Sequence, residues 1–491
     1  MEVIKLKMRN YAMLQMTECA PHIVSEISEH FCFEVPGAKF MPAVKKRIWD
    51  GKIRLFNRTN GELNAGLYES LRKFAAERGY GIKVEEGKYG YPYDKNKVPH
   101  MAFQEFIESL NLPFKPRDYQ YDAIVHGIEN KRSIILSPTG SGKSLIIYIL
   151  ARWYLAQHNM KLLLIVPTTS LVEQMYKDFY EYGYDVEKNV HRIYSGKDKV
   201  TDCPIIISTW QSIYKLGSPW FQQFGCIVGD EVHGFKSKSL SSIMNKSTEA
   251  EYRFGTTGTL DGTTVHKLVL EGLFGPTYTS VTTAKLQEDK HLAKLDIDII
   301  LLKYKRELCQ LTDGRTYQDE IDFIVQYEKR NNFIANLATR LEGNTLVLFN
   351  LVDKHGKVLR PLIENRLKNG QRFFFVSGET KTTDREQIRN IVDRQNNSII
   401  LASLGTFSTG INIKNIHNIV FASPSKSQIR VLQSIGRGLR LSDNGSTTRL
   451  YDIADDLHIK SKKNFTLLHS AERVKIYARE KFPFKITQVP I

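Results

Sequence analysis

The stretch from Ser137 to Ser144, which reads Ser-Pro-Thr-Gly-Ser-Gly-Lys-Ser, constrains the fold of this chain more than any other feature. It follows a short apolar run at 133–136 and precedes a longer one at 145–153. A glycine-bearing turn between a strand and a helix lets backbone N–H groups converge on phosphate oxygens, and the helix N-terminus adds partial positive charge. The stretch therefore predicts a strand, a phosphate-binding loop and a helix, although Ser137 stands where such loops usually begin with glycine.

Each residue type in this loop suits a chemical task. Lys143 is expected to reach the β- and γ-phosphates of a nucleotide, and the Ser144 hydroxyl is expected to bind Mg²⁺. The other predicted nucleotide contacts in the loop are Pro138, Thr139, Gly140, Ser141 and Gly142. The predicted cofactors are a nucleoside triphosphate and Mg²⁺.

Two adjacent carboxylates, Asp230 and Glu231, close a second apolar run at 226–229. A carboxylate at the tip of a strand can complete the magnesium shell that Ser144 begins. Glu231 is then placed to orient or deprotonate the attacking water, and His233 joins the predicted catalytic set. The alternative is an exposed acidic turn, but the phosphate loop upstream favours the catalytic interpretation.

The rest of the chain alternates apolar strands with helical stretches in two blocks. The first block has strand candidates at 133–137, 162–167, 204–208, 226–229 and 252–256. The second has them at 344–349, 372–376, 398–402, 418–422 and 448–453. Near-continuous apolar strands are typical of parallel sheets covered by helices on both faces. We therefore predict an α/β protein with two doubly wound parallel-sheet lobes in tandem, at 98–284 and 285–491, after a small α+β domain and linker at 1–97.

Composition narrows the choice of partner. The chain has 491 residues and a net charge of +16, which favours a polyanion, nucleic acid first and an anionic membrane second. A merely solubilising surface is the alternative. The five cysteines form no CxxC pair, so neither a zinc site nor a disulfide framework is indicated and a reducing cytoplasm is expected. No apolar run approaches the roughly 18 residues of a membrane span.

Together these motifs resemble those of superfamily 2 helicases, and the resemblance covers the C-terminal four fifths of the chain. It implies that the two lobes are RecA-like and that the nucleotide is ATP. The stretch 116–120 resembles the motif whose glutamine reads adenine, so Arg117 and Gln120 are assigned to the nucleotide. A glutamine amide offers the paired donor and acceptor that a base edge requires.

Further motifs of the family follow in order. Stretches at 166–171 and 208–212 resemble those that hold nucleic-acid phosphates, a kind of contact that positions the strand without reading bases. Stretches at 346–350 and 403–412 resemble two further motifs of the family in the second lobe. The residues assigned to nucleic-acid contact are Thr168, Ser208, Thr209, Asn350 and Thr406. Thr257-Gly-Thr259 stands where the family couples the ATP site to the nucleic-acid site, with a simple turn as the alternative.

The last motif, 433–440, places Arg437 and Arg440 three residues apart, which puts both on one face of a helix. In the family such an arginine stabilises charge on the γ-phosphate, an effect worth roughly a thousand-fold in rate. A solvated basic helix is the alternative. Gly410 and Asn412 are also assigned to the nucleotide, with Asn412 in place of the commoner aspartate.

The N-terminal domain contains a basic and aromatic segment. Between residues 39 and 58 there are seven basic residues and one acid, Asp50, with three aromatic residues interleaved. This mixture suits phosphate contacts combined with base stacking or a wedge at a duplex junction. The predicted contacts are Lys45, Lys46, Arg47, Trp49, Lys52 and Arg54. Alternatively, the aromatic residues belong to the core and the charges solvate one face.

The resemblance extends to branch-migrating DNA helicases of phages. It implies ATP-dependent 3′-to-5′ unwinding or branch migration of forks, Holliday junctions, D-loops and R-loops in recombination, replication and repair. It also implies a monomer in the host cytoplasm, away from membranes, acting on branched DNA and RNA–DNA hybrids beside single-strand-binding or recombination proteins. The alternatives are the translocating subunit of a restriction enzyme, an RNA helicase, and an ATP-gated translocase or annealing protein. His233, where DEAD-box RNA helicases have aspartate, argues against the RNA helicase.

Overall fold

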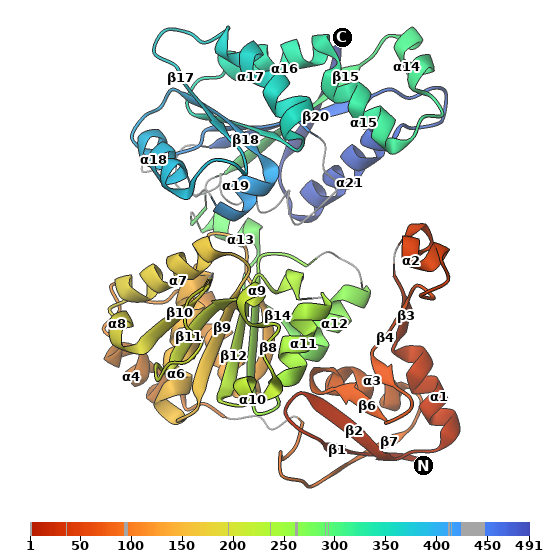
Figure 1. The fold of residues 1–491 in the computed structure, drawn as a ribbon, viewed down its shortest axis with the longest axis vertical. Helices are drawn as coiled ribbons and strands as arrows, with labels where there is room; N and C mark the ends of the chain where they lie inside the picture. Colours follow the sequence, from red (N-terminus) through yellow and green to blue (C-terminus); the bar gives the residue numbers. More distant parts are fainter. Residues whose placement is uncertain are drawn as a thin grey trace. The chain divides into compact units, whose positions relative to one another are not determined.

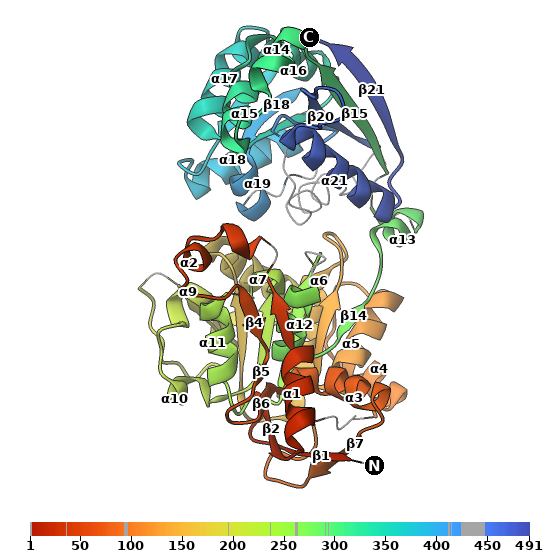
Figure 2. The same cartoon turned by 90° about the vertical axis from the view of Figure 1, so that its right-hand side faces the viewer.

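The computed structural model describes residues 2–35, 37–92, 97–194, 196–235, 237–260, 264–289, 291–292, 294–410, 413, 415–423 and 447–491. The chain forms two compact units (Figures 1 and 2). One comprises Met1–Ser137 with Gly142–Ser280, and the other comprises Pro138–Ser141 with Val281–Ile491. The predicted domain boundaries at 97/98 and 284/285 stay predictions.

The first unit begins with a small mixed domain, residues 2–85, which we call the N-terminal module. Its described part contains a five-stranded sheet in the order β5-β6-β2-β1-β7, in which β1 pairs with β7 in parallel and the other pairs are antiparallel. The strands are β1 (Val3–Met8), β2 (Met13–Glu18), β5 (Phe56–Asn57), β6 (Glu62–Asn64) and β7 (Gly81–Glu85). The helices are α1 (Pro21–His30), η2 (Ala65–Leu67) and α3 (Tyr68–Glu77), whose apolar residues join those of the sheet in one core.

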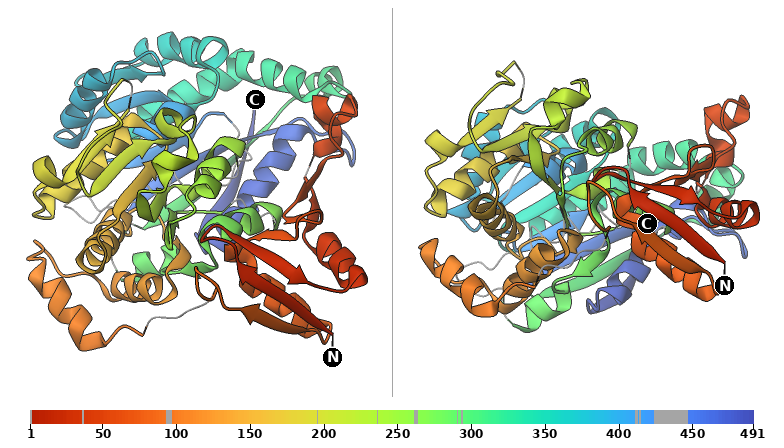
Figure 3. Two further views of the ribbon diagram at one scale, coloured as in Figure 1. Left: turned by 60° about the horizontal axis from the view of Figure 1, so that its bottom comes forward. Right: turned by 90° about the horizontal axis from the view of Figure 1, so that it is seen from below.

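A two-stranded ribbon extends from this module (Figures 1 and 3). It consists of β3 (Cys32–Glu34) and β4 (Lys52–Arg54), which pair in antiparallel register with Phe33 opposite Ile53. Between the strands the chain forms η1 (Ala38–Phe40) and α2 (Pro42–Lys45) at the tip. We refer to residues 32–54 as the ribbon.

The remainder of the first unit is lobe 1, whose described residues contain a seven-stranded sheet in the order β10-β11-β9-β12-β13-β8-β14 with every pair parallel. The strands are β8 (Arg132–Leu136), β9 (Lys161–Val166), β10 (Val190–Ile193), β11 (Ile205–Thr209), β12 (Phe224–Asp230), β13 (Tyr252–Thr257) and β14 (Thr277–Thr279). The helices are α4 (His100–Ser109), α5 (Asp118–Asn130), α6 (Lys143–Gln157), α7 (Thr169–Glu181), α8 (Val186–Asn189), α9 (Trp210–Ile213), α10 (Ser218–Phe221), η3 (Val232–Gly234), α11 (Lys238–Lys246) and α12 (Thr264–Phe274). Apolar clusters lie on both faces of the sheet, as expected for buried parallel strands.

The N-terminal module is joined to lobe 1 by several direct contacts. The Tyr11 amide donates to the Thr248 carbonyl at 3.0 Å, and Asn64 Nδ2 donates to Asn245 Oδ1 at 3.1 Å. Leu268 of α12 packs against the core of the module. These bonds, together with shared apolar burial, make the module and lobe 1 one compact unit.

The second unit contains lobe 2, with a second seven-stranded parallel sheet in its described residues, in the order β17-β18-β16-β19-β20-β15-β21. The strands are β15 (Leu295–Lys303), β16 (Thr345–Phe349), β17 (Arg372–Val376), β18 (Ser398–Ser403), β19 (Asn418–Phe421), β20 (Thr448–Asp456) and β21 (Phe484–Pro490). The helices are α13 (Thr283–Glu288), α14 (Arg306–Thr312), α15 (Tyr317–Gln326), α16 (Glu328–Arg340), η4 (Val352–Gly356), α17 (Lys357–Glu364), α18 (Thr382–Asp393), α19 (Leu404–Gly410) and α21 (Phe465–Arg479). The predicted fold class and the ten predicted strands are confirmed.

The last residues of the chain belong to lobe 2. Strand β21 adds to the sheet edge beside β15, and α21 packs on β20. Arg473 of α21 is fully buried and pairs with Asp452 of β20 at 2.7 Å. A buried charge needs such a partner, because removing one member leaves the other without compensation. Among the described helices, none is long and apolar enough to cross a membrane.

Candidate functional site

The predicted phosphate loop joins β8 to α6. Gly140 and Gly142 have φ angles of 85° and 80°, a left-handed conformation that glycine adopts without steric cost. A Cβ added at Gly142 would collide with Nε2 of Gln120. The left-handed φ angles therefore favour glycine at these two positions, and a backbone without a Cβ lets a phosphate approach closely.

Lys143 connects this loop with the acidic end of β12. Its Nζ donates to the Ser137 carbonyl at 3.2 Å and lies 4.0 Å from Oε1 of Glu231. Both side chains are mostly buried. The ammonium group is therefore held at the carboxyl edge of the sheet, between the strand that precedes the loop and the predicted general base.

Asp230 is the last residue of β12 and is buried. Its Oδ1 accepts hydrogen bonds from Thr256 Oγ1 at 2.7 Å and from the Glu231 amide at 2.9 Å. Burial, followed by the neighbouring Glu231 carboxylate, raises the pKa of Asp230 to about 6, although Lys143 and the two hydrogen bonds oppose the shift. Two carboxylates forced together in this way favour a nearby cation.

Glu231 has a left-handed backbone, with φ at 51°, and its side chain meets two other predicted residues. Its Oε2 lies 3.3 Å from Nδ1 of His233 and accepts from Thr257 Oγ1 at 3.4 Å. His233 Nδ1 is in turn 3.1 Å from Thr257 Oγ1. The paired ends of β12 and β13 thus bring the acidic motif and the threonine motif into one hydrogen-bonded cluster.

Ser144, in the first turn of α6, has a partner that no motif indicated. Its Oγ lies 2.8 Å from the hydroxyl of Tyr182, which follows the end of α7. Burial raises the pKa of Tyr182 to about 12, so this phenol stays protonated. Only the tertiary fold brings Tyr182 to the loop, since tyrosine at this position matches no spacing rule.

The predicted adenine-reading residues lie at the start of α5. Oε1 of Gln120 accepts from the Arg117 amide at 2.8 Å, which caps the helix, and Arg117 Nη1 donates to the Tyr119 hydroxyl at 3.0 Å. Gln120 is buried beside Gly142, so its amide is held next to the phosphate loop. The role of both residues in base recognition stays a prediction.

The donor set fits a magnesium-bound triphosphate. Magnesium is usually held by one or two protein oxygens together with substrate phosphates, rather than by a cage of protein ligands. Ser144 and Asp230 offer one hydroxyl and one carboxylate of that kind. Among the described residues, no group of three or more His, Cys, Asp or Glu side chains could hold a metal without such help.

The predicted nucleic-acid residues of lobe 1 lie at the carboxyl ends of β9 and β11, at one edge of the sheet. Thr168 follows β9, and Ser208 and Thr209 are the last two residues of β11. Thr168 caps α7, accepting from the Leu171 amide at 3.4 Å. Thr209 Oγ1 lies 2.8 Å from the hydroxyl of Ser212. The Ser208 hydroxyl is fully buried and donates to the Ile193 carbonyl at 3.1 Å, so a ligand would meet this position through its neighbours.

The predicted residues of lobe 2 are only partly described. Asn350 is exposed directly after β16, whereas Thr406 is buried in α19 and accepts from Ser403 Oγ at 2.7 Å. Gly410 is the last residue of α19. Asn412, Arg437 and Arg440 lie outside the described residues.

The ribbon carries both basic and apolar side chains at its surface. Phe40 is 69% exposed and Ile48 is 76% exposed, so neither belongs to the core. Trp49 is half-buried, and its Nε1 donates to the Lys52 carbonyl at 3.0 Å. The exposed basic residues are Lys39, Lys45, Lys46, Arg47, Lys52 and Arg54.

The alternative that the aromatic residues of the basic segment belong to the core applies to Phe56 but not to Phe40. Phe56, outside the ribbon, is buried in the core of the N-terminal module, whereas Phe40 is solvent-exposed. Asp50 pairs with Arg54 at 2.5 Å, and this hydrogen bond lowers the pKa of Asp50 to about 2. One positive charge is thereby neutralised, and the remaining surface stays strongly basic.

Three family models match the sequence. The model of the DNA helicase UvsW N-terminal domain matches residues 3–85, and that of the type III restriction enzyme res subunit matches residues 113–262. The helicase conserved C-terminal domain matches residues 328–442. The ATP-dependent DNA helicase uvsW of Enterobacteria phage T4 is 35% identical over 508 aligned residues, covering 99% of each chain. The DNA 3′-5′ translocase XPB2 of Sulfurisphaera tokodaii is 27% identical and covers 56% of this chain and 55% of the relative.

Solved structures agree with the sequence matches. The crystal structure of T4 UvsW superposes with a TM-score of 0.52 at 32% identity, and the match covers 100% of both chains. The type ISP restriction-modification enzyme LlaBIII bound to DNA gives a TM-score of 0.57 at 16% identity, covering 77% of this chain and 32% of that one. At that identity the second match supports the fold alone.

Proposed function

Because this chain belongs to the UvsW family of superfamily 2 helicases and is an ATP-dependent DNA helicase, we propose that it moves 3′ to 5′ on branched DNA. The proposed substrates are forks, Holliday junctions, D-loops and R-loops formed in recombination, replication and repair. The direction is supported by the similarity to XPB2, a DNA 3′-5′ translocase. We further propose that Mg²⁺ accompanies ATP.

The observation that carries the proposal is the cluster of Lys143, Glu231, His233 and Thr257 at one edge of the lobe 1 sheet. Thr168 lies just after β9 and Thr209 is the last residue of β11, and these two strands end at the same edge. Since parallel strands place their carboxyl ends together, ATP chemistry and strand contacts share one rigid element. ATP hydrolysis at this edge can therefore change the contacts that the same edge makes with the DNA strand.

The residues of the site divide the work. Bound ATP and Mg²⁺ supply the phosphoanhydride to be cleaved and a counter-charge for its oxygens. Lys143 binds the phosphates through Nζ, and the oxygens of Ser144 and Asp230 are the proposed metal ligands. Glu231 orients the attacking water and accepts its proton on a carboxylate oxygen. His233 and Thr257 hold that carboxylate in place.

The first test is Lys143→Ala. This variant is expected to bind DNA with nearly unchanged affinity and to lose ATP hydrolysis and unwinding, because Nζ contacts phosphates and not the strand. Steady-state ATPase, strand displacement and DNA-binding assays measure the three properties. Robust ATP hydrolysis by the variant would contradict the site assignment.

The second test concerns Arg437 and Arg440, which we propose stabilise charge on the transferring phosphoryl group. Arg437→Ala and Arg440→Ala are expected to lower kcat by roughly a thousand-fold and to change ATP affinity less. Nucleotide-binding titrations compared with steady-state kinetics separate the two effects. A loss of affinity with unchanged kcat would argue against this role.

The substrate proposal is tested with a panel of forked, four-way, hybrid and single-stranded substrates, including RNA. ATPase stimulation and unwinding are measured at two salt concentrations, because phosphate contacts make affinity depend on salt. Forked or four-way DNA is expected to be unwound most rapidly. Preference for RNA would favour the RNA helicase alternative, and ATPase activity without strand displacement would favour the translocase or annealing protein.

A further inference from the structure

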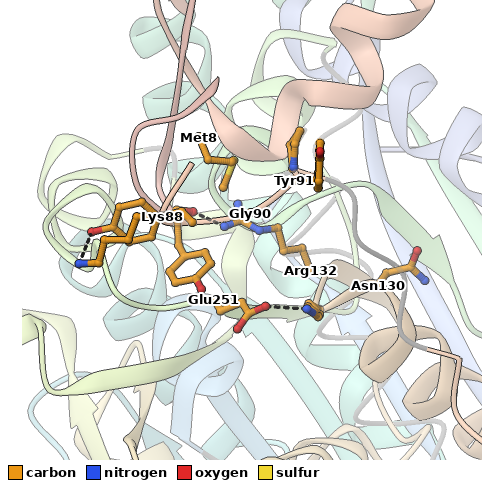
Figure 4. Close-up of a pocket in the computed structure, with 11 residues that line it drawn as sticks. Met8, Lys88, Gly90, Tyr91, Asn130, Arg132 and Glu251 are labelled. Carbon is orange, nitrogen blue, oxygen red and sulfur yellow. Dashed lines mark hydrogen bonds and ion pairs between the residues drawn. The ribbon is translucent and has the colours of Figure 1, made fainter. Parts of the chain in front are cut away.

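A pocket of about 140 Å³ lies where the N-terminal module meets lobe 1 (Figure 4). It is lined by the turn between β1 and β2, by residues 88–92 after β7, and by residues at the starts of β8 and β13. Arg132 begins β8, and the phosphate loop follows the other end of the same strand. The pocket is therefore at the edge of the sheet opposite the ATP site and is separate from it.

Arg132 has a donor with no acceptor in the described structure. Arg132 is 8% exposed, and its Nη2 donates to the Tyr11 carbonyl. Its Nη1 is buried and has no hydrogen-bond partner among the described residues. Burial lowers the pKa of Arg132 to about 10, so the guanidinium remains charged at neutral pH. A buried donor of this kind costs stability unless an acceptor reaches it.

The neighbouring strand shows how such a group is normally satisfied. Arg253 of β13 stands opposite Arg132 in the register and is also buried. Its Nε and Nη1 donate to the carbonyls of Ala250 and Met244, both at 3.0 Å, and Nη2 donates to that of Ser247. Each of the three guanidinium nitrogens of Arg253 thus bonds a backbone carbonyl, whereas Arg132, which lines the pocket, has one buried nitrogen without a partner among the described residues.

The charges around the pocket favour an anion. Lys88, Lys131 and Arg132 line it, and Glu251 is the acidic residue among the lining side chains. Lys131 Nζ pairs with Glu251 Oε1 at 2.6 Å, which leaves Lys88 and Arg132 as the positive excess. A cavity of 140 Å³ also exceeds the roughly 30 Å³ that one water occupies.

The mouth of the pocket is aromatic. Tyr91 is 54% exposed, and Tyr11 and Tyr89 pack edge to face with ring centroids 5.1 Å apart. Figure 4 shows Tyr91, Gly90 and Glu251 around Arg132. Basic groups beside exposed aromatic rings are the usual means of holding single-stranded nucleic acid, through backbone phosphates and stacked bases.

We propose that this pocket binds a backbone phosphate of single-stranded DNA, with the side chains of Arg132 and Lys88 supplying the positive charge and Tyr91 stacking on the adjoining base. The proposal rests on the DNA helicase function and adds a strand contact remote from the ATP site. Lys88 is an exposed second cation in the lining of the pocket. Inorganic phosphate shares the same chemistry, so the experiment must distinguish the two sources.

The principal test uses the full-length double variant Lys88→Ala/Tyr91→Ala. Its matched control is Lys177→Ala/Tyr180→Ala, which removes a lysine and a tyrosine with the same spacing from α7, where they are 70% and 68% exposed. Binding of an oligothymidine is measured by fluorescence anisotropy across a salt series. The pocket variant is expected to bind about tenfold more weakly, with a salt slope smaller by about 0.7, and the control is expected to match the parent.

A direct readout is photo-cross-linking of a 5-iodouracil oligothymidine to the parent protein. Labelling of a peptide that contains Tyr91 is expected, and its absence overturns the proposal. Arg132→Met adds a third comparison in thermal unfolding with inorganic phosphate or oligothymidine. Stabilisation that depends on Arg132 and arises with inorganic phosphate but not with the oligonucleotide would overturn the DNA assignment.

These outcomes separate the pocket from the general function. If the pocket variant and the control bind DNA equally well, the pocket proposal fails and the helicase function stands. If the parent protein neither binds the oligonucleotide nor shows DNA-stimulated ATPase activity, the proposed function itself fails. The surface variant Lys88→Ala/Tyr91→Ala keeps the test valid even if Arg132→Met does not fold.

Discussion

At the scale of single residues, Asp230 determines how the site responds to pH. Its pKa of about 6 arises mainly from burial, and a protonated carboxyl group is a poor magnesium ligand. We expect ATPase activity to fall as pH decreases through about 6, and additional Mg²⁺ to move the midpoint to lower pH by competing with the proton. A pH–rate profile at two Mg²⁺ concentrations measures this, and a midpoint insensitive to Mg²⁺ would contradict it.

The raised pKa of Asp230 affects stability in the opposite direction from activity. The pKa of Asp230 is raised in the folded protein from 3.8, so the folded state binds the proton more tightly than the unfolded state. The contribution of Asp230 to the free energy of unfolding therefore decreases as pH rises from about 4 to about 6 and is constant above that range. Ionisation of Asp230 therefore destabilises the folded protein, and a bound cation offsets this loss of stability.

Thr256 provides a second prediction at this scale. Its Oγ1 donates to Asp230 Oδ1 at 2.7 Å and lowers the pKa of that carboxyl group. Thr256→Val keeps the shape of the side chain but removes the donor, so the midpoint of the pH–rate profile should move upward. Thr339→Val is a matched control, since that buried hydroxyl bonds a helix carbonyl in lobe 2. Equal profiles for the two variants would count against the role of Thr256.

At the scale of elements, the ribbon extends from the N-terminal module and carries large apolar side chains that lie outside the core. Phe40 and Ile48 are largely exposed among lysines and arginines, which suits insertion at a duplex junction. The short antiparallel pair β3–β4 holds the tip away from the five-stranded sheet. The ribbon is therefore expected to contribute to strand separation and not to folding or hydrolysis.

Phe40→Ala/Ile48→Ala tests this expectation. Unwinding of forked DNA should fall about tenfold, while the maximal ATPase rate and the melting temperature stay close to those of the parent. Val200→Ala, at a 79% exposed apolar position of lobe 1, is the control. Gel-based strand displacement and steady-state ATPase assays supply the comparison, and parallel losses of both activities would refute a wedge role.

At the scale of the whole molecule, the contact of the N-terminal module with lobe 1 depends on a close backbone approach. A Cβ at Gly66 in η2 would collide with the carbonyl oxygens of Glu271 and Gly272 in α12. Gly66→Ala is expected to lower the free energy of unfolding by about 1–3 kcal/mol and to weaken coupling of the ribbon to the ATPase lobe. Gly87→Ala, where a Cβ meets open space, is the control.

Chemical denaturation followed by unwinding assays checks this prediction. Gly66→Ala should unfold at lower denaturant concentration than the parent, and its unwinding should fall more than its ATPase activity. Gly87→Ala should resemble the parent in each measurement. A Gly66→Ala protein with unchanged stability would show that the module does not depend on this contact.

Short-range pattern was sufficient to predict the fold class, ten strands of the two parallel sheets, the phosphate loop and the acidic motif, but not the strands β10, β14, β15 and β21. These features depend on residues that are close together in the sequence: apolar strands, glycines at left-handed positions and carboxylates at strand ends. They can therefore be recognised from the sequence alone. The confirmed strands and the close approach of Lys143 to Glu231 follow from that locality, because parallel strands bring their carboxyl ends to one edge.

Tertiary structure alone decided which side chains meet across long separations. Tyr182 reaches Ser144, Thr256 supports Asp230, and the last strand, β21, pairs with β15 rather than forming a separate element. Packing also made Phe56 a buried core residue and Phe40 an exposed one. It left one nitrogen of Arg132 without an acceptor among the described residues, whereas the nitrogens of Arg253 bond backbone carbonyls. These outcomes depend on packing and on the satisfaction of buried polar groups, which are properties of the assembled core and not of any stretch of sequence.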